Sequence, residues 1–221
     1  MTLASSAIRG QLSIWTDIDM AYEADFNRWY DREHMQERMG IPGFMRARRF
    51  HAVTPCPRPY LALYDTESLQ VFRQPSYQEA LARQSDWSRL NFSRMRDTQR
   101  RVGELVVDAG RGEGGALALF LCGGQGLQLS QIDSSMQALV GRDRVIRCSL
   151  LRPDQALSSP LLPGAAPAPA DMVAMVEATD PSAAFDAATA LASEFACGQP
   201  GSVHVFRALW RLGHDAHSSA G

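Results

Sequence analysis

One series of strands and helices occurs twice along the chain, and this repetition is the strongest constraint on its fold. Alternating or wholly apolar runs predict strands, and apolar residues three and four positions apart predict helices. The strands predicted in the first half are residues 11–18, 44–53, 60–64 and 102–108. The strands predicted in the second half are residues 116–122, 145–152, 172–178 and 202–212. With the helices between them, each half reads strand–helix–strand–strand–helix–strand.

The predicted helices lie in the gaps of this series. The first begins at Tyr22 and ends at the Ile-Pro-Gly turn of residues 41–43, because proline and glycine disfavour its continuation. Asp86 is expected to cap a later helix. The inner side of that helix is expected to carry Trp87, Leu90 and Met95. The helices predicted in the second half are residues 129–140 and 181–195.

A glycine-rich segment separates the two series. Residues 108–115 read DAGRGEGG, a composition typical of a flexible joint. A phosphate-binding loop is the other interpretation, but the segment lacks the lysine-serine ending of a P-loop and the GxGxxG order. The expected organisation is a first half over residues 1–110, a joint over 111–115, a second half over 116–213 and a disordered tail over 214–221.

The order of elements in each half is that of a split βαβ, or ferredoxin-like, unit (βαββαβ). We therefore expect an α+β chain in which two ferredoxin-like halves pack their sheets face to face and bury both. Residues 54–59 and 153–171 are too rich in proline to form elements and are expected to be loops. The second loop is expected to pack poorly and to tolerate deletion of residues 165–170.

Composition and charge exclude several classes of function. The chain has 221 residues and a net charge of −2, so it has no basic field that would hold nucleic acid. No apolar run approaches the ~20 residues that cross a bilayer, and the N-terminus has no apolar core long enough for a signal peptide. The four cysteines are scattered without a CxxC pair, which argues against a zinc site and a disulfide framework. We therefore expect a reduced cytoplasmic protein.

Residues 25–44, DFNRWYDREHMQERMGIPGF, carry the densest set of groups that can do chemistry. At about 100° per residue, Glu33 and Glu37 continue a helical stripe of aromatic residues, and His34 lies at its edge. A histidine beside carboxylates suits proton transfer near pH 7. The candidate catalytic residues are His34, Glu37 and Tyr30. The candidate substrate-binding residues are Trp29, Glu33, Tyr60, Tyr64 and His51. No metal site is expected, because the helix has no HExxH pattern.

Each of these assignments has a structural alternative. A single histidine on an amphipathic helix can be a packing or surface residue, and Phe26 and Trp29 can be core residues rather than a surface on which a ligand stacks. Glu33 and Glu37 can instead belong to an ion network with arginines of the next strand. Those arginines are Arg46, Arg48 and Arg49.

Motifs around this stretch resemble a known superfamily. Trp29, His34 and the Ile-Pro-Gly-Phe turn at residues 41–44 are followed by a strand and then by Pro-Tyr-Leu at residues 59–61. This pattern is similar to the dimeric α/β-barrel superfamily, and within it to the EthD-like and methylmuconolactone-isomerase-like branch. Members of that branch have an aromatic first helix with a late histidine. The resemblance covers roughly residues 10–108, and the second half matches in element order alone, as a degenerate copy would.

The resemblance implies that a barrel usually built from two chains is built here within one, by tandem duplication. It also implies a cofactor-independent enzyme that transfers protons, as an isomerase or cyclase, on a small aromatic, lactone or polyketide-like carbonyl compound; cofactor-free monooxygenases belong to the same branch. Two other functions remain open: a non-catalytic ligand-binding or assembly protein, and a heme-binding member with a histidine as axial ligand.

The expected partner is a small-molecule substrate, with a homodimer as a further option and with neither nucleic acid nor a membrane. We expect its pocket in the first half only, lined by Trp29, Tyr30, His34 and a tyrosine of the third strand. The corresponding helix of the second half, residues 129–140, has no histidine and no aromatic residue.

Overall fold

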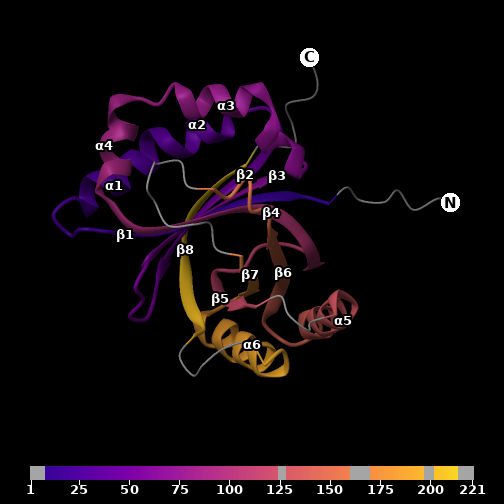
Figure 1. Cartoon of the computed structure of the whole chain (residues 1–221). Coiled ribbons are helices and arrows are strands. Elements are labelled where there is room, and N and C mark those ends of the chain that lie inside the picture. Colours follow the sequence, from indigo (N-terminus) through magenta and orange to yellow (C-terminus); the bar gives the residue numbers. More distant parts are fainter. Residues whose placement is uncertain (1–7, 124–127, 160–169, 197–201, 214–221) are drawn as a thin grey trace, which may run out of the picture.

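The computed structural model describes residues 8–123, 128–159, 170–196 and 202–213 of the chain. In this part of the chain, eight antiparallel strands form a closed barrel in the order β1-β3-β2-β8-β5-β7-β6-β4 (Figure 1). The strands are β1 (Gly10–Ile18), β2 (Phe44–Ala52), β3 (Tyr60–Thr66), β4 (Met95–Gly110), β5 (Ala116–Cys122), β6 (Val145–Pro153), β7 (Met172–Ala178) and β8 (His204–Gly213).

The helices cover the outside of the barrel on two opposite sides (Figure 1). Those of the first half are α1 (Glu23–Trp29), a π-helical turn η1 (Tyr30–His34), α2 (Met35–Met39), a 3-10 turn η2 (Leu69–Arg73), α3 (Pro75–Ala82) and α4 (Asp86–Arg94). Those of the second half are α5 (Leu129–Val140) and α6 (Pro181–Glu194). The barrel therefore has a helical layer on each side, and the two layers differ in composition.

The expectation of two separate sheets packed face to face is wrong. Strands β4-β1-β3-β2 and strands β6-β7-β5-β8 are neighbours within each half, but their outer strands also pair across the halves. Strand β4 pairs with β6, for example Leu105 with Leu151, and β2 pairs with β8, for example Arg48 with Arg211. Closing the sheet in this way satisfies the backbone groups that free edge strands would expose.

Side chains point alternately to the two faces of each strand, so the buried residues form one cluster inside the barrel and two clusters outside it. Inside the barrel, Trp15, Leu63, Leu119, Met175 and Phe206 belong to one buried cluster. Outside, one cluster packs the aromatic residues of the first half against its strands, and the other packs α5 and α6 against theirs. The helix α6 contributes mainly small buried side chains to its cluster: Ala183, Ala184, Ala187, Ala188 and Ala192. The first half is therefore the one with an aromatic layer between helices and sheet.

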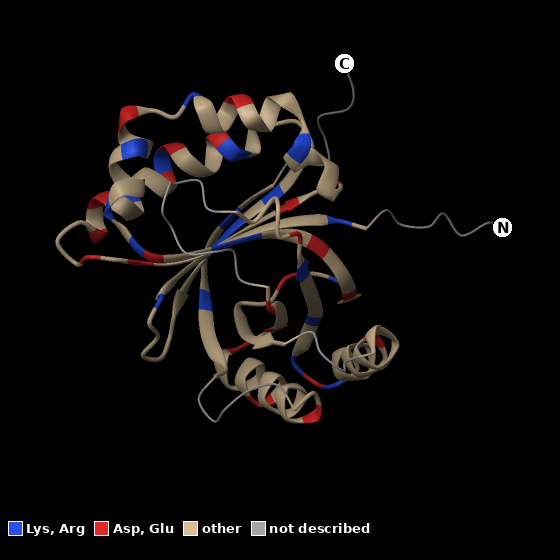
Figure 2. Cartoon of the chain, in the orientation of Figure 1, with Lys and Arg blue, Asp and Glu red and all other residues tan. Residues whose placement is uncertain are grey.

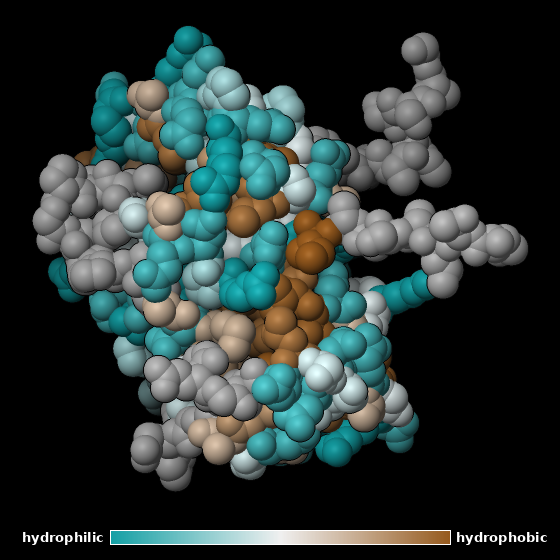
Figure 3. All heavy atoms as spheres, turned by 45° about the vertical axis from the view of Figure 1, so that its right-hand side comes forward, coloured by the Kyte–Doolittle hydropathy of each residue, from teal (hydrophilic) through white to brown (hydrophobic). Residues whose placement is uncertain are grey.

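Charged residues occur on the barrel strands as well as on the helices (Figure 2). Several of them are buried, including Arg48, Arg101, Arg147, Asp65 and Glu177. The face shown in Figure 3 is largely hydrophilic, with a band of hydrophobic residues running down its middle. These buried charges require partners within the protein.

Several predicted details of the elements differ from the structure; among them, Ser85 rather than Asp86 caps α4. Strand β4 begins at Met95 rather than at residue 102, because its polar start pairs with β1, where Asp17 opposes Arg96. Leu90 of α4 is 44% exposed and not on the inner side. The start of the loop after β6 is packed, since the Ser158 hydroxyl is buried and hydrogen-bonds to the backbone of Val102.

Two further predictions concern residues outside those that the structure describes. These are the tail over residues 214–221 and the deletion of residues 165–170, most of which falls in the segment 160–169. Among the described helices, none has both the length and the apolar character required to cross a membrane.

Candidate functional site

A π-helical turn carries two of the three candidate catalytic residues. The helix that begins at Glu23 continues to Met39, but residues Tyr30–His34 form a π turn within it. A π turn inserts one residue into the helical repeat, and such insertions occur frequently at functional sites. Both end residues of the turn, Tyr30 and His34, have buried side chains.

The inserted residue corrects the predicted position of the glutamates. A regular helix would direct Glu33 and Glu37 toward the sheet, but after the π turn the buried positions are His34, Met35, Arg38 and Met39. The Glu37 side chain is 41% exposed. The expected stripe is therefore displaced by one residue, and the histidine takes the inward position that the prediction had assigned to a carboxylate.

His34 is enclosed by aromatic rings. Its imidazole stacks on the indole of Trp29, with ring centroids 4.3 Å apart, and meets Tyr30 edge-on at 5.2 Å. Tyr64 of β3 and Phe92 of α4 also meet it edge-on, at 6.3 Å and 5.5 Å. The residue is 4% exposed. The sequence-predicted residues Trp29, Tyr30, His34 and Tyr64 are thus brought together around one imidazole.

The surroundings hold His34 in its neutral form. Burial lowers the pKa of His34 well below its usual 6.5, and the positive charges of Arg38 and Arg49 lower it further. Burial likewise raises the pKa of the Tyr30 hydroxyl, and raises that of Tyr64 well above its usual value. At pH 7 the site therefore contains a neutral imidazole and two neutral phenols.

His34 retains free hydrogen-bonding capacity. Its Nδ1 atom is buried and has no hydrogen-bond partner among the described residues. The nearest carboxylate oxygen, Glu37 Oε2, lies 3.9 Å away, which is too long for a hydrogen bond. Burial and the neighbouring Glu33 raise the pKa of Glu37. Glu37 is thus beside the imidazole without fixing its tautomer in this structure.

The glutamates and the arginines do not form the ion network that was the structural alternative. Glu33 accepts a hydrogen bond from the Ser85 hydroxyl. Arg49 instead donates to Asp31 at 3.0 Å and to Asn27 at 2.8 Å, and its guanidinium carbon lies 4.0 Å from the centroid of the Tyr30 ring. Arg46 and Arg48 point into the barrel and pair with other carboxylates.

Tyr60 and His51 lie beside this cluster rather than in it. The Tyr60 hydroxyl donates to Glu23 at 2.7 Å and accepts from Asn27 at 3.0 Å, and burial raises its pKa to about 12. The His51 ring meets the Tyr60 ring edge-on at 4.9 Å. These two residues form a second group around the start of α1, separate from His34.

Helix α4 contributes residues that the sequence analysis did not single out. Ser88 accepts the indole N–H of Trp29 at 3.0 Å, and Phe92 covers His34. The buried residues of α4 are polar, Ser88 and Asn91. Its Phe92 ring meets the Trp29 ring edge-on at 5.2 Å, and its other polar contacts with α1 converge on Asp25. Asp25 accepts from the Trp87 indole at 3.2 Å and pairs with Arg94 at 3.1 Å. Apolar periodicity predicted the helix itself but not these polar contacts, because hydrogen-bonding residues do not follow an apolar repeat.

The two cavities that the structure shows most clearly lie elsewhere. One lies between α5 and α6, beside Gln131, Ser135 and Phe195. The other lies at one end of the barrel and is lined by charged residues. His34 lines neither of them. In the described residues, no group of histidine, cysteine, aspartate and glutamate side chains could hold a metal ion.

No protein-family model matches the chain, and no curated protein matches it in sequence. Solved structures do resemble it. An anthrone oxidase-like protein aligns with a TM-score of 0.63 at 11% identity, over 100% of this chain and 99% of that chain. A candidate monooxygenase from Lactobacillus acidophilus aligns with a TM-score of 0.60 at 7% identity, over 93% of this chain and 96% of that chain. A heme-binding protein from Thermus thermophilus aligns with a TM-score of 0.53 at 13% identity, over 92% of each chain.

These structural neighbours belong to the dimeric α/β-barrel superfamily, and the closed barrel described above is consistent with that fold. At identities this low, the likeness concerns the fold alone. It extends over nearly the whole of each chain, so the barrel of these proteins corresponds to both halves of this one.

Proposed function

We propose that this chain is a small-molecule enzyme without a bound cofactor, which transfers a proton through His34. The observation that carries the proposal is the buried His34 imidazole on its π turn, with Nδ1 unpartnered among the described residues. A buried polar atom without a partner is costly, so a position that retains one is a candidate site of function. The same imidazole is held neutral, as a general base requires.

The surrounding groups suit a substrate that becomes an anion. His34 would accept a proton from a carbon next to a carbonyl group, or from a phenol, and leave an enolate or phenolate. The guanidinium groups of Arg38 and Arg49 act on the site electrostatically, and the Tyr30 and Tyr64 hydroxyls could donate to the anionic oxygen. Return of the proton to another carbon is isomerisation, and attack of the carbanion on a second carbonyl is cyclisation.

The aromatic walls indicate the shape of the substrate. Rings of Trp29, Tyr30, Tyr64 and Phe92 surround the imidazole, so a flat aromatic, lactone or polyketide-like compound matches them best. The site is closed in this structure. Helix α4 is the part that would move to admit a substrate, because its Phe92 covers His34 and its two buried residues, Ser88 and Asn91, are polar.

We further propose that the two halves are ferredoxin-like copies produced by duplication, and that the first, an EthD-like half, retains the site. The equal strand order within each half supports this history. The unequal helical layers support a single site, since α6 covers its strands mainly with alanines, and α5 has Ile132, Met136 and Leu139 at its buried positions.

Monooxygenation is the second candidate reaction. It is favoured by the names of two structural neighbours, the anthrone oxidase-like protein and the candidate monooxygenase. In that reaction the same deprotonation by His34 would produce a carbanion, which forms a C–O bond with dioxygen, the oxidant. The O–O bond of the resulting peroxide then breaks, so that one oxygen atom stays on the carbon as a carbonyl group and the other leaves as water. Heme does not fit the site, because four aromatic rings occupy the space around the imidazole within 6.3 Å of its centroid.

Hydrogen exchange in D₂O tests the proposal without knowledge of the product. A panel of cyclic 1,3-diketones, unsaturated lactones and polyhydroxylated aromatic ketones is incubated with the protein, and deuterium at carbon is followed by NMR. We expect exchange of at least one compound above the buffer rate, and a reduction of about 10²–10⁴-fold in His34→Gln. His204→Gln is the matched control, since His204 contacts Trp15 inside the barrel. Equal exchange rates in His34→Gln and the parent protein would refute the proposal.

A further inference from the structure

An arginine-lined cleft of about 740 Å³ opens at one end of the barrel, away from His34. Its walls include Arg9, Arg46, Arg147 and Arg211, together with Asp108 and Glu113. These residues come from both halves and from the joint between them, so the cleft exists only in the closed barrel. A cleft of this size can hold an organic molecule rather than a single inorganic ion.

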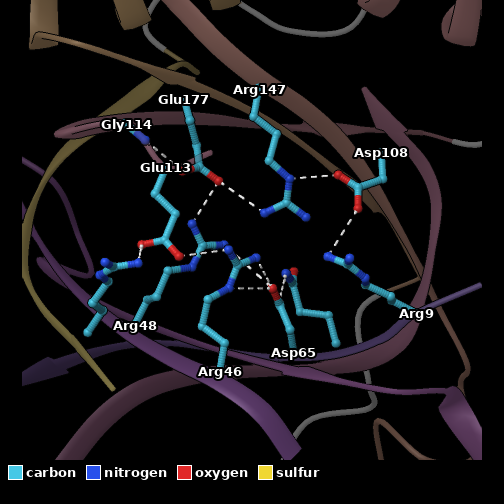
Figure 4. A network of polar contacts seen from close by, with 11 residues as sticks. Arg9, Arg46, Arg48, Asp65, Asp108, Glu113, Gly114, Arg147 and Glu177 are labelled. Carbon is cyan, nitrogen blue, oxygen red and sulfur yellow. Dashed lines mark hydrogen bonds and ion pairs between the residues drawn. The ribbon is translucent and has the colours of Figure 1, made fainter. Parts of the chain in front are cut away.

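Each carboxylate around the cleft is already engaged by arginines (Figure 4). Asp65 pairs with Arg46, Glu113 accepts from Arg46 at 2.8 Å, and Glu177 accepts from Arg48 at 2.7 Å. The arginines around Asp65 lower its pKa to about 2, so it is ionised. No carboxylate of this network is left free to bind a further cation.

Arg147 has more donors than the carboxylates around it use. Its Nε donates to Asp108 at 2.6 Å and its Nη1 to Glu177 at 3.4 Å. Its Nη2 is buried and has no partner among the described residues. Arg147 as a residue is only 3% exposed, yet it lines the cleft. An unsatisfied N–H of a buried guanidinium is costly, and an anionic ligand would relieve that cost.

The charge balance of the network also favours an anionic ligand. Among the described residues, the five arginines Arg9, Arg46, Arg48, Arg147 and Arg211 face the four carboxylates Asp65, Asp108, Glu113 and Glu177. Burial and the positive charge of Arg147 oppose the charged form of Arg46, but Asp65 and Glu113 outweigh them, so the pKa of Arg46 is raised. All 22 basic residues of the chain are arginines, and arginine does not lose its proton in proteins.

We propose that this cleft is a binding site for a small organic anion, whose carboxylate or phosphate group lies against Arg147 and Arg9. Arg9 is suited to that role because its ion pair with Asp108, at 3.7 Å, is too long for a hydrogen bond, and its side chain is 41% exposed. The joint contributes Glu113 and the backbone N–H of Gly114 to the network, and the N–H donates to Glu177 at 3.1 Å. Arginines, rather than a glycine-rich phosphate loop, therefore provide the anion-binding groups.

The test measures binding to the full chain with defined anions. Thermal unfolding is followed against increasing succinate or inorganic phosphate, with chloride at matched ionic strength as the reference, and isothermal titration calorimetry gives the Kd. We expect a saturable rise in Tm with one of the two anions, and the stronger anion identifies the group that the site prefers. Arg147→Gln and Arg9→Gln are expected to weaken binding by about tenfold or more.

Arg152→Gln is the matched control, because Arg152 lies on the same strand as Arg147 but pairs with Glu104 outside the cleft. Its Kd is expected to equal that of the parent protein. If Arg147→Gln does not fold, Arg9→Gln decides, since the Arg9 side chain lies at the exposed edge of the network and its loss leaves the buried ion pairs in place. The proposal is overturned if neither anion raises the Tm beyond chloride, or if all variants bind equally.

Discussion

The imidazole of His34 lies stacked on the indole of Trp29, with centroids 4.3 Å apart and planes inclined by 29°. The same indole donates its N–H to Ser88 of α4 at 3.0 Å. Trp29 therefore connects the π turn, which carries the proposed base, to the helix that covers it. A change in either contact alters both the environment of the imidazole and the attachment of α4.

The buried imidazole predicts a pH dependence of stability. The folded-state pKa of His34 is lowered well below 6.5, so between the two values the unfolded chain binds a proton that the folded chain does not. The stabilising difference is complete above pH 6.5 and is lost as the pH falls. For this one group, we expect the free energy of unfolding to fall by about 1.4 kcal/mol per pH unit below pH 6.5.

Urea unfolding at pH 7.5, 6.5, 5.5 and 5.0 measures this effect. The difference between the parent protein and His34→Gln is expected to change with the slope of one proton, because glutamine does not titrate. His51→Gln is the control, since His51 lies beside Tyr60 and outside the His34 cluster. Parallel pH profiles of the parent protein and His34→Gln would mean that His34 titrates alike in the folded and unfolded chains.

Loss of the Ser88 hydroxyl is expected to destabilise the protein. In Ser88→Ala the buried indole N–H of Trp29 loses its acceptor, and an unsatisfied buried donor costs about 1–3 kcal/mol. Ser93→Ala is the matched control on the same helix, because the Ser93 hydroxyl is exposed and bonds only to the Leu90 carbonyl. Chemical denaturation of both variants gives the comparison. A cost in Ser88→Ala no larger than in Ser93→Ala would show that water replaces the hydroxyl.

Local periodicity predicted many of the elements, because strongly apolar strands and helices have a clear repeat. Strands β5 and β7 and helix α5 occur with the predicted bounds. The closure of the barrel was not predictable in this way. It depends on β4 pairing with β6 and β2 with β8, and pairing between distant edges leaves no mark in the repeat of either strand. A partial signal did exist, since Arg46 and Arg48 alternate along β2 and therefore require charged partners on one face.

The candidate site was predictable as a set of residues but not as a geometry. Trp29, Tyr30 and His34 were found because they are aromatic or titratable groups in one dense stretch. The π turn was not, because one inserted residue changes which side chains face inward without changing composition. The contribution of α4 was missed for a different reason. Several of its contacts are polar, since Ser88 accepts the indole N–H of Trp29 while Trp87 and Arg94 donate to Asp25, and these do not follow an apolar period.

Replacement of Arg101 is expected to stabilise the protein. Arg101 is 2% exposed, donates from Nη1 to Gln99 at 2.8 Å, and has no partner for Nε and Nη2 among the described residues. Burial lowers its pKa to about 10, which reflects the cost of holding the charge there. Arg101→Met removes that cost, and we expect a gain of about 1–3 kcal/mol in the free energy of unfolding.

Urea unfolding compares Arg101→Met with Arg96→Met, an exposed arginine of the same strand that pairs with Asp19. The second variant is expected to change stability by less than about 1 kcal/mol. A loss of stability in Arg101→Met comparable to that of a core truncation would contradict the prediction. It would mean that the packing of the arginine stem outweighs the cost of its buried charge.

The ionised Asp65 predicts a second, more acidic transition. Its folded-state pKa is about 2, against 3.8 in the unfolded chain, because Arg48, Arg46 and Arg147 stabilise the carboxylate despite its burial. A depressed carboxyl pKa contributes stability that is complete above about pH 4 and is lost as the pH falls through 2. The contribution is about 2 kcal/mol.

In Asp65→Asn this contribution is absent, and the arginines around residue 65 lose a counter-charge. We therefore expect the variant to be less stable at pH 7 and the gap to the parent protein to narrow by about 2 kcal/mol between pH 5 and pH 2. Denaturant unfolding across that range measures the gap, with Asp86→Asn on exposed α4 as the control. A gap that stays constant down to pH 2 would show that Asp65 titrates alike in the folded and unfolded chains, and that the arginines do not act on it.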